Sequence, residues 1–493
     1  MRIPINRQSP MPLYQQISSF IREQIKSGTL TTGSRLPATR DLAVSLGVGR
    51  LTVANAYADL QSKGLITGQP GSGTFIAAPA PGNRPTMEKT HQATLPDWQQ
   101  AMGVQNRLSN SQRQDELIHS VNHNDLISFA EGNGDPRLFP IEDFRKSCQQ
   151  VMQRFGQTTL DYGDLAGYLP LRRTIAQILT SQGIPCHPDR LLVISGSQQG
   201  LALTLSLLAK EGENVVVESP THMGFLDLCH ARGIRLLEIP VDEQGMQVDK
   251  LEAILQSNPV RLIYTVPNFQ NPTGTCLSSP RRRMLVGLAE KYQVPILEDD
   301  YVGDLRYKGA AQPAIKALDP GSHVIYVGTF SKMLIPSLRV GFLTAGGPVF
   351  ERLLSLKHSE DVCTSNLIQQ ALNDYISIGR YQASLRKARQ IFGKRRSAML
   401  AALGREMPTG AAWQPPAGGL FIWLRLPDGL SADRLFPFAA ARGVIYTPGS
   451  LFFTPGKGKD FLRLNFSLQL PERIDEGIKR LAAAIKDCQS NNQ

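Results

Sequence analysis

One lysine of the sequence stands in a setting that could make it a nucleophile. Lys332 lies in the apolar stretch TFSKMLIPSLRVG, residues 329–341, between small hydroxylated residues and a proline. Most lysines lie solvated at the surface, and that is the simpler interpretation of this one. A primary amine held in an apolar site can instead form a Schiff base with a carbonyl compound. Thr329 and Arg339 flank the lysine and offer a hydroxyl and a guanidinium, which bind phosphate well.

Four other short segments place polar side chains directly after predicted strands. The segments are ISGSQQGL from residue 194, ESPTHMG from 218, VPNFQNPTG from 266 and ILEDDYVGD from 296, and their candidate residues are Ser197, Gln198, His222, Asn271, Asp299 and Tyr301. Ligands of open parallel sheets bind beyond the carboxyl ends of the strands, so we expect these side chains to gather at one edge. Ser197 and Gln198 begin a helical pattern, and a helix N-terminus readily binds phosphate.

These residue types match what a pyridoxal phosphate (PLP) site requires. The cofactor needs a lysine for the imine, a carboxylate beside the pyridine nitrogen and a hydrogen-bond donor to the ring oxygen. Lys332, Asp299 and Asn271 are the candidates for these roles, and His222 could lie against the ring face. Asp299 and Asp300 are adjacent acids, which would repel each other unless one faces a cation such as a pyridinium.

The elements that would position these residues follow from residue 125 onward. The apolar runs LLVISG, NVVVES, RLLEIP, RLIYTVPN, VPILEDD and HVIYVG are rich in β-branched residues and bounded by turns. Long helical patterns, such as 197–210 and 281–292, separate several of these runs. The alternation predicts an α/β domain with a mainly parallel sheet, followed by a small C-terminal α+β lobe.

The spacing of NPTG, EDDY and SK…P.LR.G, with PPAGGLFIWLRLP and FLRLNFS further on, resembles the fold-type I aminotransferases over residues 125–490. The resemblance implies a PLP-dependent transferase fold in which Lys332 forms the internal aldimine and Asp299 faces the pyridine nitrogen. It implies ring-oxygen contacts from Asn271 and Tyr301. It also implies phosphate contacts from Ser197, Gln198, Thr329 and Arg339.

Three further residues take roles from the same resemblance. Arg463, in FLRLNFS, would bind a substrate carboxylate in bidentate fashion, with a structural ion pair as the alternative. Tyr162, in DYGDLAGYLPLRR, would reach the phosphate of the neighbouring subunit's cofactor, which implies a dimer. His222 stands where the family usually carries an aromatic residue, often tyrosine. A histidine can stack on a ring; in the alternative interpretation it only caps the loop.

The first 77 residues carry a different pattern. The segment PLYQQISSFIREQIK, 12–26, has apolar residues on one helical face, and two shorter helical patterns then end at Gly47 and Gly64. The run LITGQPGSGTFIA after them has two β-like segments around a Gly-rich turn. The order of helices, turn and hairpin predicts a winged helix-turn-helix.

The segment LPATRDLAVSLGVGRLTVANAYADLQSKGLI, with GSGTFI after it, resembles the GntR class of winged-helix DNA-binding domains over residues 11–77. By position, Arg40 would bind DNA phosphate, and Arg50, Thr52 and Asn55 would lie at the start of the recognition helix in the major groove. Gly71 would let the wing approach the DNA backbone. In the alternative interpretation Arg40 pairs with Asp41 or Asp59 and Gly71 only turns the hairpin.

Composition sets outer limits on the function. The 493 residues suggest two or three domains, and we expect a DNA-binding domain at 1–77, a Pro- and Gln-rich linker at 78–115 and the large domain at 116–493. The net charge is +11, and residues 1–80 hold eight Lys/Arg against three Asp/Glu, which suits a polyanionic partner. No apolar run approaches the roughly 20 residues of a membrane span. The six scattered cysteines suggest neither disulfides nor a metal site and fit a reducing cytoplasm.

A GntR-like domain ahead of an aminotransferase-like domain resembles the MocR/GabR family of bacterial PLP-dependent transcription regulators. The resemblance implies a head-to-tail, domain-swapped homodimer that binds a double-stranded DNA operator in the cytoplasm, on the nucleoid. We therefore expect a regulator that holds PLP on Lys332 and senses PLP or an amino compound through aldimine formation. The alternative is an active aminotransferase that carries a DNA-binding domain, because all the groups that bind PLP are present.

Overall fold

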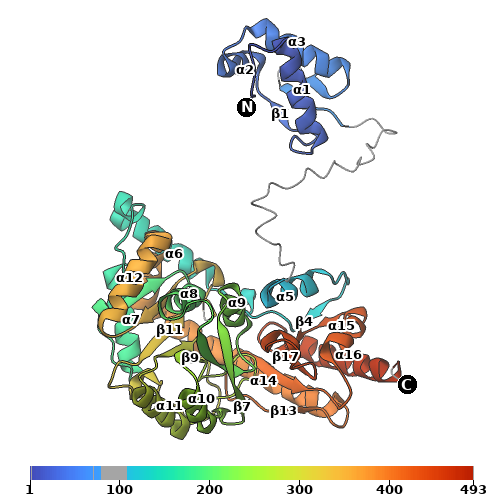
Figure 1. The fold of residues 1–493 in the computed structure, drawn as a ribbon. Coiled ribbons are helices and arrows are strands. Elements are labelled where there is room, and N and C mark those ends of the chain that lie inside the picture. Colours follow the sequence, from blue (N-terminus) through green and yellow to red (C-terminus); the bar gives the residue numbers. More distant parts are fainter. Residues whose placement is uncertain (2, 70–71, 79–107, 333, 492–493) are drawn as a thin grey trace. The chain divides into compact units, whose positions relative to one another are not determined.

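The structure is a computed structural model that describes residues 1, 3–69, 72–78, 108–332 and 334–491 (Figure 1). The chain divides into two compact units, Met1–Asn106 and Arg107–Gln493, and each is described by itself. Within the described ranges no helix is both long and apolar enough to cross a bilayer.

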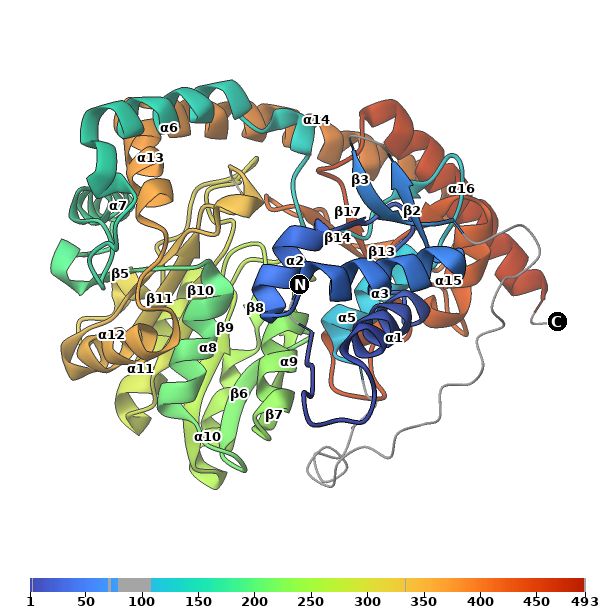
Figure 2. The ribbon, with the colours of Figure 1, turned by 90° about the horizontal axis from the view of Figure 1, so that it is seen from above.

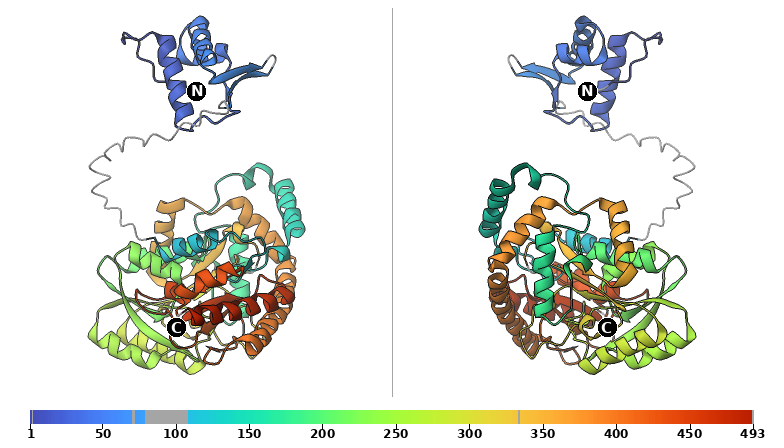
Figure 3. Two further views of the ribbon diagram at one scale, coloured as in Figure 1. Left: turned by 90° about the vertical axis from the view of Figure 1, so that its right-hand side faces the viewer. Right: turned by 90° about the vertical axis from the view of Figure 1, so that its left-hand side faces the viewer.

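The N-terminal unit is a small helical domain with a three-stranded antiparallel sheet (Figure 3). Its elements are α1 (Leu13–Lys26), β1 (Arg35–Leu36), α2 (Thr39–Leu46), α3 (Arg50–Ser62), β2 (Ile66–Gln69) and β3 (Gly73–Ile76), and the strand order is β1-β3-β2. Ile17 and Ile21 of α1, Leu42 of α2, and Val53 and Leu60 of α3 are fully buried in its core. The predicted apolar faces therefore pack together.

A tight turn separates α2 from α3. Gly47 ends α2 with φ +61°, a left-handed conformation that favours glycine, and Gly49 precedes α3 in an extended conformation. Strands β2 and β3 pair as the predicted hairpin, with Ile66 opposite Ile76. The predicted winged helix-turn-helix is confirmed.

The C-terminal unit is built on an eight-stranded sheet of order β5-β12-β11-β10-β9-β6-β7-β8. The strands are β5 (Leu191–Ile194), β6 (Asn214–Ser219), β7 (Arg235–Asp242), β8 (Gly245–Met246), β9 (Val260–Thr265), β10 (Ile296–Asp300), β11 (Val324–Thr329) and β12 (Gly341–Thr344). The neighbours from β11 to β7 are parallel, whereas β12 runs antiparallel to both β5 and β11, and β8 runs antiparallel to β7. The mainly parallel sheet is confirmed.

Both faces of this sheet are covered, because alternate residues of each strand join different apolar clusters. Val215 and Val217 of β6 pack in one cluster with α8 (Ser197–Leu208), whereas Val216 packs in the other with α10 (Leu251–Ser257) and α11 (Ser279–Tyr292). Figure 1 shows α10 and α11 together on one side of the sheet. The other helices of the large domain are α6 (Ile141–Phe155), α7 (Leu169–Ser181), α9 (Met223–Ala231), α12 (Gly347–Asp361) and α13 (Asn366–Ser377).

The C-terminal lobe, residues 380–490, holds a small antiparallel sheet of order β13-β14-β17-β16. Its strands are β13 (Ala412–Trp413), β14 (Phe421–Arg425), β16 (Thr447–Pro448) and β17 (Phe461–Asn465), and its helices are α14 (Arg380–Glu406), α15 (Ala432–Ala441) and α16 (Pro471–Ser490). Strand β15 (Val444–Ile445) pairs with β4 (Ile127–Ser128), which ties this lobe to the start of the large domain. Helix α16 packs against α14 and α15, and Figure 2 shows α15 and α16 at one end of the unit, with α14 running from there toward α6.

Two features differ from the sequence-based expectation. Helix α5 (Asn110–His119) falls inside the interval predicted as linker, so the linker prediction is wrong for residues 110–115; residues 79–107 lie outside the described residues. Strand β12 was not predicted. Its four residues follow directly on the Lys332 segment, and so short a run has no boundary signal of its own.

Candidate functional site

A cavity of about 330 Å³ opens at the carboxyl edge of the large sheet. Ten of the predicted site residues line it: Ser197, Gln198, His222, Asn271, Asp299, Tyr301, Thr329, Lys332, Arg339 and Arg463. They come from the ends of five strands and from the C-terminal lobe, so the expected gathering at one edge is observed. Tyr162 does not line this cavity.

The amine of Lys332 lies within the cavity and has one hydrogen-bond partner among the described residues. Its Nζ donates to Asn133 Oδ1 at 2.8 Å. Burial, together with the positive charges of Arg463 and Arg339, lowers the pKa of Lys332 to about 8. A substantial fraction of the amine is therefore neutral near physiological pH, which is the nucleophilic form.

Asp299, the last but one residue of β10, has one carboxylate oxygen bonded and one without a partner among the described residues. Tyr264 donates its hydroxyl to Asp299 Oδ2 at 2.9 Å, while buried Oδ1 has no partner among the described residues. Burial raises the pKa of Asp299 to about 7, against the lowering effect of the Tyr264 hydrogen bond. A cationic N–H donor placed at Oδ1 would favour the ionised carboxylate, as expected for a pyridine-nitrogen partner.

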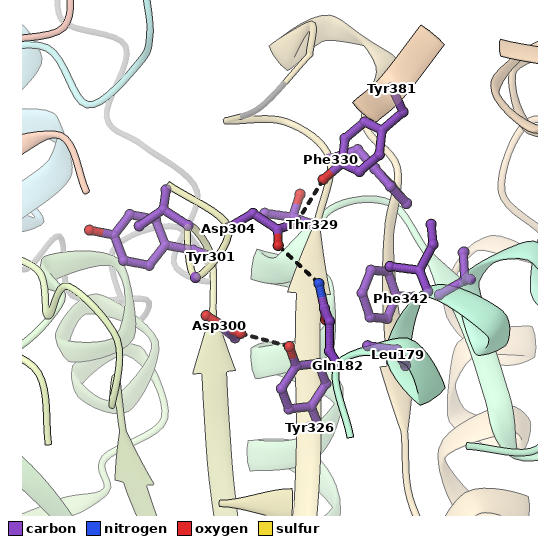
Figure 4. Close-up of a pocket in the computed structure, with 14 residues that line it drawn as sticks. Leu179, Gln182, Asp300, Tyr301, Asp304, Tyr326, Thr329, Phe330, Phe342 and Tyr381 are labelled. Carbon is purple, nitrogen blue, oxygen red and sulfur yellow. Dashed lines mark hydrogen bonds between the residues drawn. The ribbon is translucent and has the colours of Figure 1, made fainter. Parts of the chain in front are cut away.

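The adjacent acid Asp300 is kept apart from Asp299 by the alternation of side chains along the strand. Its carboxylate accepts a hydrogen bond from the Tyr326 hydroxyl at 2.7 Å (Figure 4) and one from Asn268 Nδ2 at 3.3 Å. Asp300 lines a separate cavity of about 40 Å³. The expected repulsion is thus relieved partly by geometry, with a tyrosine rather than a cation beside Asp300.

A second end of the cavity is suited to an anion. Helix α8 begins at Ser197 after Gly196, and no side chain caps its first turn. Arg339 reaches the same turn, where its Nη2 donates to the Ser195 carbonyl at 3.0 Å. A Cβ built on Gly196, whose φ is +89°, would lie 2.5 Å from Arg339 Nη2, so the glycine gives the guanidinium its place. Free backbone N–H groups and a guanidinium together form a phosphate site.

The end of β11 adds hydroxyl groups to this anion site. Thr329 Oγ1 accepts a hydrogen bond from Ser331 N at 3.1 Å. The buried Ser331 hydroxyl has no partner among the described residues and lines the same cavity. The Thr329 hydroxyl also donates to the Val340 carbonyl at 3.4 Å, so the Ser331 hydroxyl is the unbonded donor for a phosphate oxygen.

The loop after β9 presents Asn271, and β10 ends beside Tyr301. The Tyr301 hydroxyl donates to the Phe269 carbonyl at 2.9 Å. Asn271 Oδ1 accepts from Arg463 Nη1 at 2.9 Å, which leaves the amide nitrogen of Asn271 as a donor. The expected donor to a ring oxygen is therefore present.

His222 follows β6 and stands in the cavity wall. Its side chain makes no capping hydrogen bond to α9, and buried Nδ1 has no partner among the described residues. Burial lowers the pKa of His222 to about 4, so the imidazole is neutral at physiological pH. Gly224 leaves space for the ring, because a Cβ there would lie 2.8 Å from His222 Cε1. A neutral imidazole that does not cap the helix is suited to lie flat against a ligand ring.

Arg463 is buried, with a side chain that has no carboxylate partner in the described part of the chain. Its guanidinium carbon lies 4.1 Å from the ring centroid of Phe421 and 4.9 Å from that of Phe452. Its Nε has no partner among the described residues, and burial lowers the pKa of Arg463 to about 10. The alternative of a structural ion pair is not observed. An unpaired buried guanidinium beside a cavity is suited to an anionic ligand group.

The DNA-binding candidates lie on the surface of the N-terminal unit. Arg40 of α2 and Arg50 and Asn55 of α3 are exposed, and Thr52 is half-buried. Across the described residues neither Arg40 nor Arg50 forms an ion pair. Asp59 pairs with Lys63 at 2.7 Å. Gly71 lies outside the described residues.

Several residues that line or support the cavity were not predicted: Asn133, Tyr264, Ser331, Ser111 and Gln114. Tyr264 sits within an apolar strand, where an aromatic residue signals packing. Ser111 and Gln114 belong to α5, within the interval assigned to the linker. Only the capping pattern SNSQ at residues 109–112 could have indicated that helix.

Comparisons with known proteins match both units. "Bacterial regulatory proteins, gntR family" matches residues 13–76, and "Aminotransferase class I and II" matches residues 124–481. The HTH-type transcriptional regulator YdfD of Bacillus subtilis is 31% identical over 97% of this chain and 98% of its own. This chain belongs to the MocR-type regulators.

The large domain of this MocR-type regulator is also similar to enzymes. Aromatic-amino-acid aminotransferase 1 of Thermococcus litoralis is 38% identical over 76% of the chain and 91% of the enzyme. The crystal structure of LysN, the alpha-aminoadipate aminotransferase of Thermus thermophilus complexed with N-(5'-phosphopyridoxyl)-L-leucine, has a TM-score of 0.73. It is 33% identical, with 80% of this chain and 99% of that chain covered.

PLP is the cofactor of this MocR-type regulator. The residues present fit the group. The uncapped α8 and Arg339 suit its phosphate, the free Oδ1 of Asp299 suits its ring nitrogen, and Lys332 suits its aldehyde.

Proposed function

We propose that the large domain senses an amino compound that carries an anionic group, and that this signal controls DNA binding by the N-terminal unit. The observation that carries the proposal is the pairing of two groups in one cavity. Lys332 offers a partly neutral amine, and Arg463 offers a buried guanidinium without a carboxylate partner in the described part of the chain.

Each side chain has a defined task in this proposal. Bound PLP supplies an aldehyde that forms an imine with a primary amine. Lys332 would hold the cofactor and would yield that place to an effector amine, and Arg463 would bind the anionic group of that effector. Asn133, which accepts a hydrogen bond from Lys332, can hold the released lysine amine. An effector that lacks either group would lose one of the two contacts.

Control of DNA binding requires that the effector bind two arrangements of the protein with different affinity. We propose a head-to-tail homodimer in which each DNA-binding domain packs on the other subunit's large domain. Tyr162 is 82% exposed, which leaves it available to reach the neighbouring subunit's cofactor phosphate. DNA contacts would come from Arg40, Arg50, Thr52 and Asn55. The regulator would act in the cytoplasm.

Aminotransferase activity is the second candidate function. It is favoured by the pKa of about 8 at Lys332, because a neutral lysine amine can also move protons during turnover. Steady formation of a keto acid from an amino donor would distinguish it. Robust turnover without any operator binding would contradict the regulator proposal.

The test is an absorbance titration followed by DNA binding. The purified PLP-bound protein is mixed with the twenty standard amino acids, β-alanine, taurine and simple amines, and the near-visible band is recorded. DNA affinity is then measured by fluorescence anisotropy, on a duplex obtained by selection from random sequences, with and without each compound that changes the spectrum. We expect at least one anionic amino compound to change both signals. A change of DNA affinity when PLP is added to the apo-protein, with no further response to the amino compounds, would instead identify a PLP sensor and refute the effector proposal.

A further inference from the structure

Helix α5 is fixed at its first turn to the large domain. Ser109 and Gln112 form a capping box, in which Ser109 Oγ accepts from Gln112 N and the Gln112 side chain accepts from Ser109 N. Asp227 of α9 accepts from Asn110 N at 2.8 Å, from Ser111 N at 2.9 Å and from Ser111 Oγ at 2.6 Å. A carboxylate at a helix N-terminus stabilises it, so this turn has a defined place on α9.

The next turn of α5 reaches the acceptors that Arg463 uses. Gln114 Nε2 donates to the Ala130 carbonyl at 2.7 Å and to Thr447 Oγ1 at 3.2 Å. Arg463 Nη2 donates to the same two oxygens, at 3.0 Å and 3.2 Å. The Thr447 hydroxyl itself donates to the Ala130 carbonyl at 2.8 Å. Gln114 and Arg463 both line the cavity, side by side at these shared oxygens.

The two shared oxygens, Ala130 O and Thr447 Oγ1, have more hydrogen-bond donors around them than their lone pairs can accept with good geometry. A carbonyl oxygen has two lone pairs, yet three donors lie within 3.0 Å of Ala130 O. Arg463 has the longest of these three bonds, and its Nε has no partner among the described residues. A guanidinium also binds an anion more strongly than a neutral carbonyl. Arg463 is therefore the donor that an arriving anion would draw away.

We propose that Gln114 is a specificity-determining residue of the effector site, because it satisfies the shared oxygens when Arg463 turns to the anionic group of the effector. The inference rests on the proposed function, in which Arg463 binds that group. With Gln114 in place, Ala130 O keeps two donors and Thr447 Oγ1 keeps one after Arg463 leaves. Without it, the departure of Arg463 strips the buried Thr447 oxygen of its last donor, which weakens anion binding.

The same exchange acts on the helix. Because Gln114 no longer shares its acceptors once the anion is bound, α5 is held more firmly in the liganded state. Coupling between two binding events is reciprocal, so a firmly docked α5 also favours the effector. Helix α5 is the first described element of the C-terminal unit, which begins at Arg107. Binding of an anionic effector thereby stabilises the element of the C-terminal unit that follows the DNA-binding domain most closely along the described chain.

Gln114→Met tests the proposal, since methionine keeps the length of the side chain and removes its donor. Gln112→Met is the matched control, because it makes the same change in an exposed side chain of α5 without touching the Arg463 oxygens, while Asp227 and Ser109 Oγ still accept from the backbone N–H groups of the first turn. The probe is the amino acid that gives the largest absorbance change in the wild-type, PLP-bound protein, compared with the amine that remains when its carboxylate is removed. Apparent dissociation constants are taken from the absorbance titrations.

For Gln114→Met we expect affinity for the amino acid to fall about fivefold to tenfold, while affinity for the amine changes less than about twofold. Gln112→Met should change neither the affinity for the amino acid nor the affinity for the amine. Equal losses for amino acid and amine in Gln114→Met would overturn the proposal, because a structural defect would affect both probes.

Hydrogen exchange of the α5 amides gives a second measurement that needs no variant. In the wild-type protein the amino acid should slow exchange across Asn110–His119, and the amine should not. Unchanged exchange with a bound amino acid would overturn the inference while leaving the proposed function intact. A wild-type protein whose spectrum responds to none of the amino acids would instead refute the proposed function.

Discussion

The pH dependence of cofactor capture follows from the setting of Lys332. Burial and the charges of Arg463 and Arg339 lower the pKa of Lys332 to about 8, against an ordinary value of 10.5. At about pH 7.5 a pKa of 8 leaves about a quarter of the amine neutral, whereas the ordinary value leaves about one molecule in a thousand. Because the neutral amine is the nucleophile, the lowered pKa of Lys332 should make PLP capture at that pH more than a hundredfold faster than it would be with a pKa of 10.5.

The assay measures how fast the apo-protein takes up PLP between about pH 6 and 10, by stopped-flow absorbance. The rate should rise with pH, because the amine loses its proton, and level off above a midpoint near 8. Arg463→Met removes the charge that lowers the pKa of Lys332 most after burial, so the midpoint should move to higher pH. Arg442→Met is the control, since Arg442 is exposed and paired with Asp487 at the surface of the C-terminal lobe.

Two results would refute this reasoning. A wild-type midpoint at or above about pH 10 would mean that the cavity does not shift the lysine. An unchanged midpoint in Arg463→Met would mean that the charge of this guanidinium does not lower the pKa of Lys332, which would leave burial and Arg339 as the causes.

Three further predictions concern the two sites. Lys332→Ala should abolish the near-visible absorbance of bound PLP while the far-ultraviolet circular dichroism stays unchanged; retained absorbance would place the imine elsewhere. Arg50→Ala should weaken DNA binding in fluorescence anisotropy without altering the PLP spectrum, and unchanged affinity would move the recognition residues to another surface. Gly196→Ala should displace Arg339 and strain the turn by about 1–3 kcal/mol, so PLP should bind at least tenfold more weakly in equilibrium dialysis; wild-type affinity would show that Arg339 does not contact the phosphate.

Much of the fold follows from local pattern. The six apolar runs became strands because β-branched residues on both faces suit a sheet covered on two sides, as Val215, Val216 and Val217 show. Helix α3 was also predictable, because Gly47 marks the end of the helix before it. In these segments local preference and tertiary packing agree.

The predictions failed where a residue acts through a partner far along the chain. Tyr264 is 35 residues from Asp299 and Asn133 is 199 residues from Lys332, so no spacing rule connects them. Helix α5 is polar and buries none of its residues, which gives it the composition of a linker. Its place depends on Asp227, more than a hundred residues away. Contacts of this kind become visible only in the folded chain.

The cavity draws its residues from two separate sources. The groups suited to the cofactor, Lys332, Arg339 and Asp299, belong to the rigid edge of the large sheet, whereas Gln114 and Arg463 come from α5 and the C-terminal lobe. Mutations in the second set can change which compound is recognised without disturbing the first. Under the proposed function, substitutions in α5 and the lobe can therefore change the recognised compound while the groups suited to the cofactor stay in place at the sheet edge.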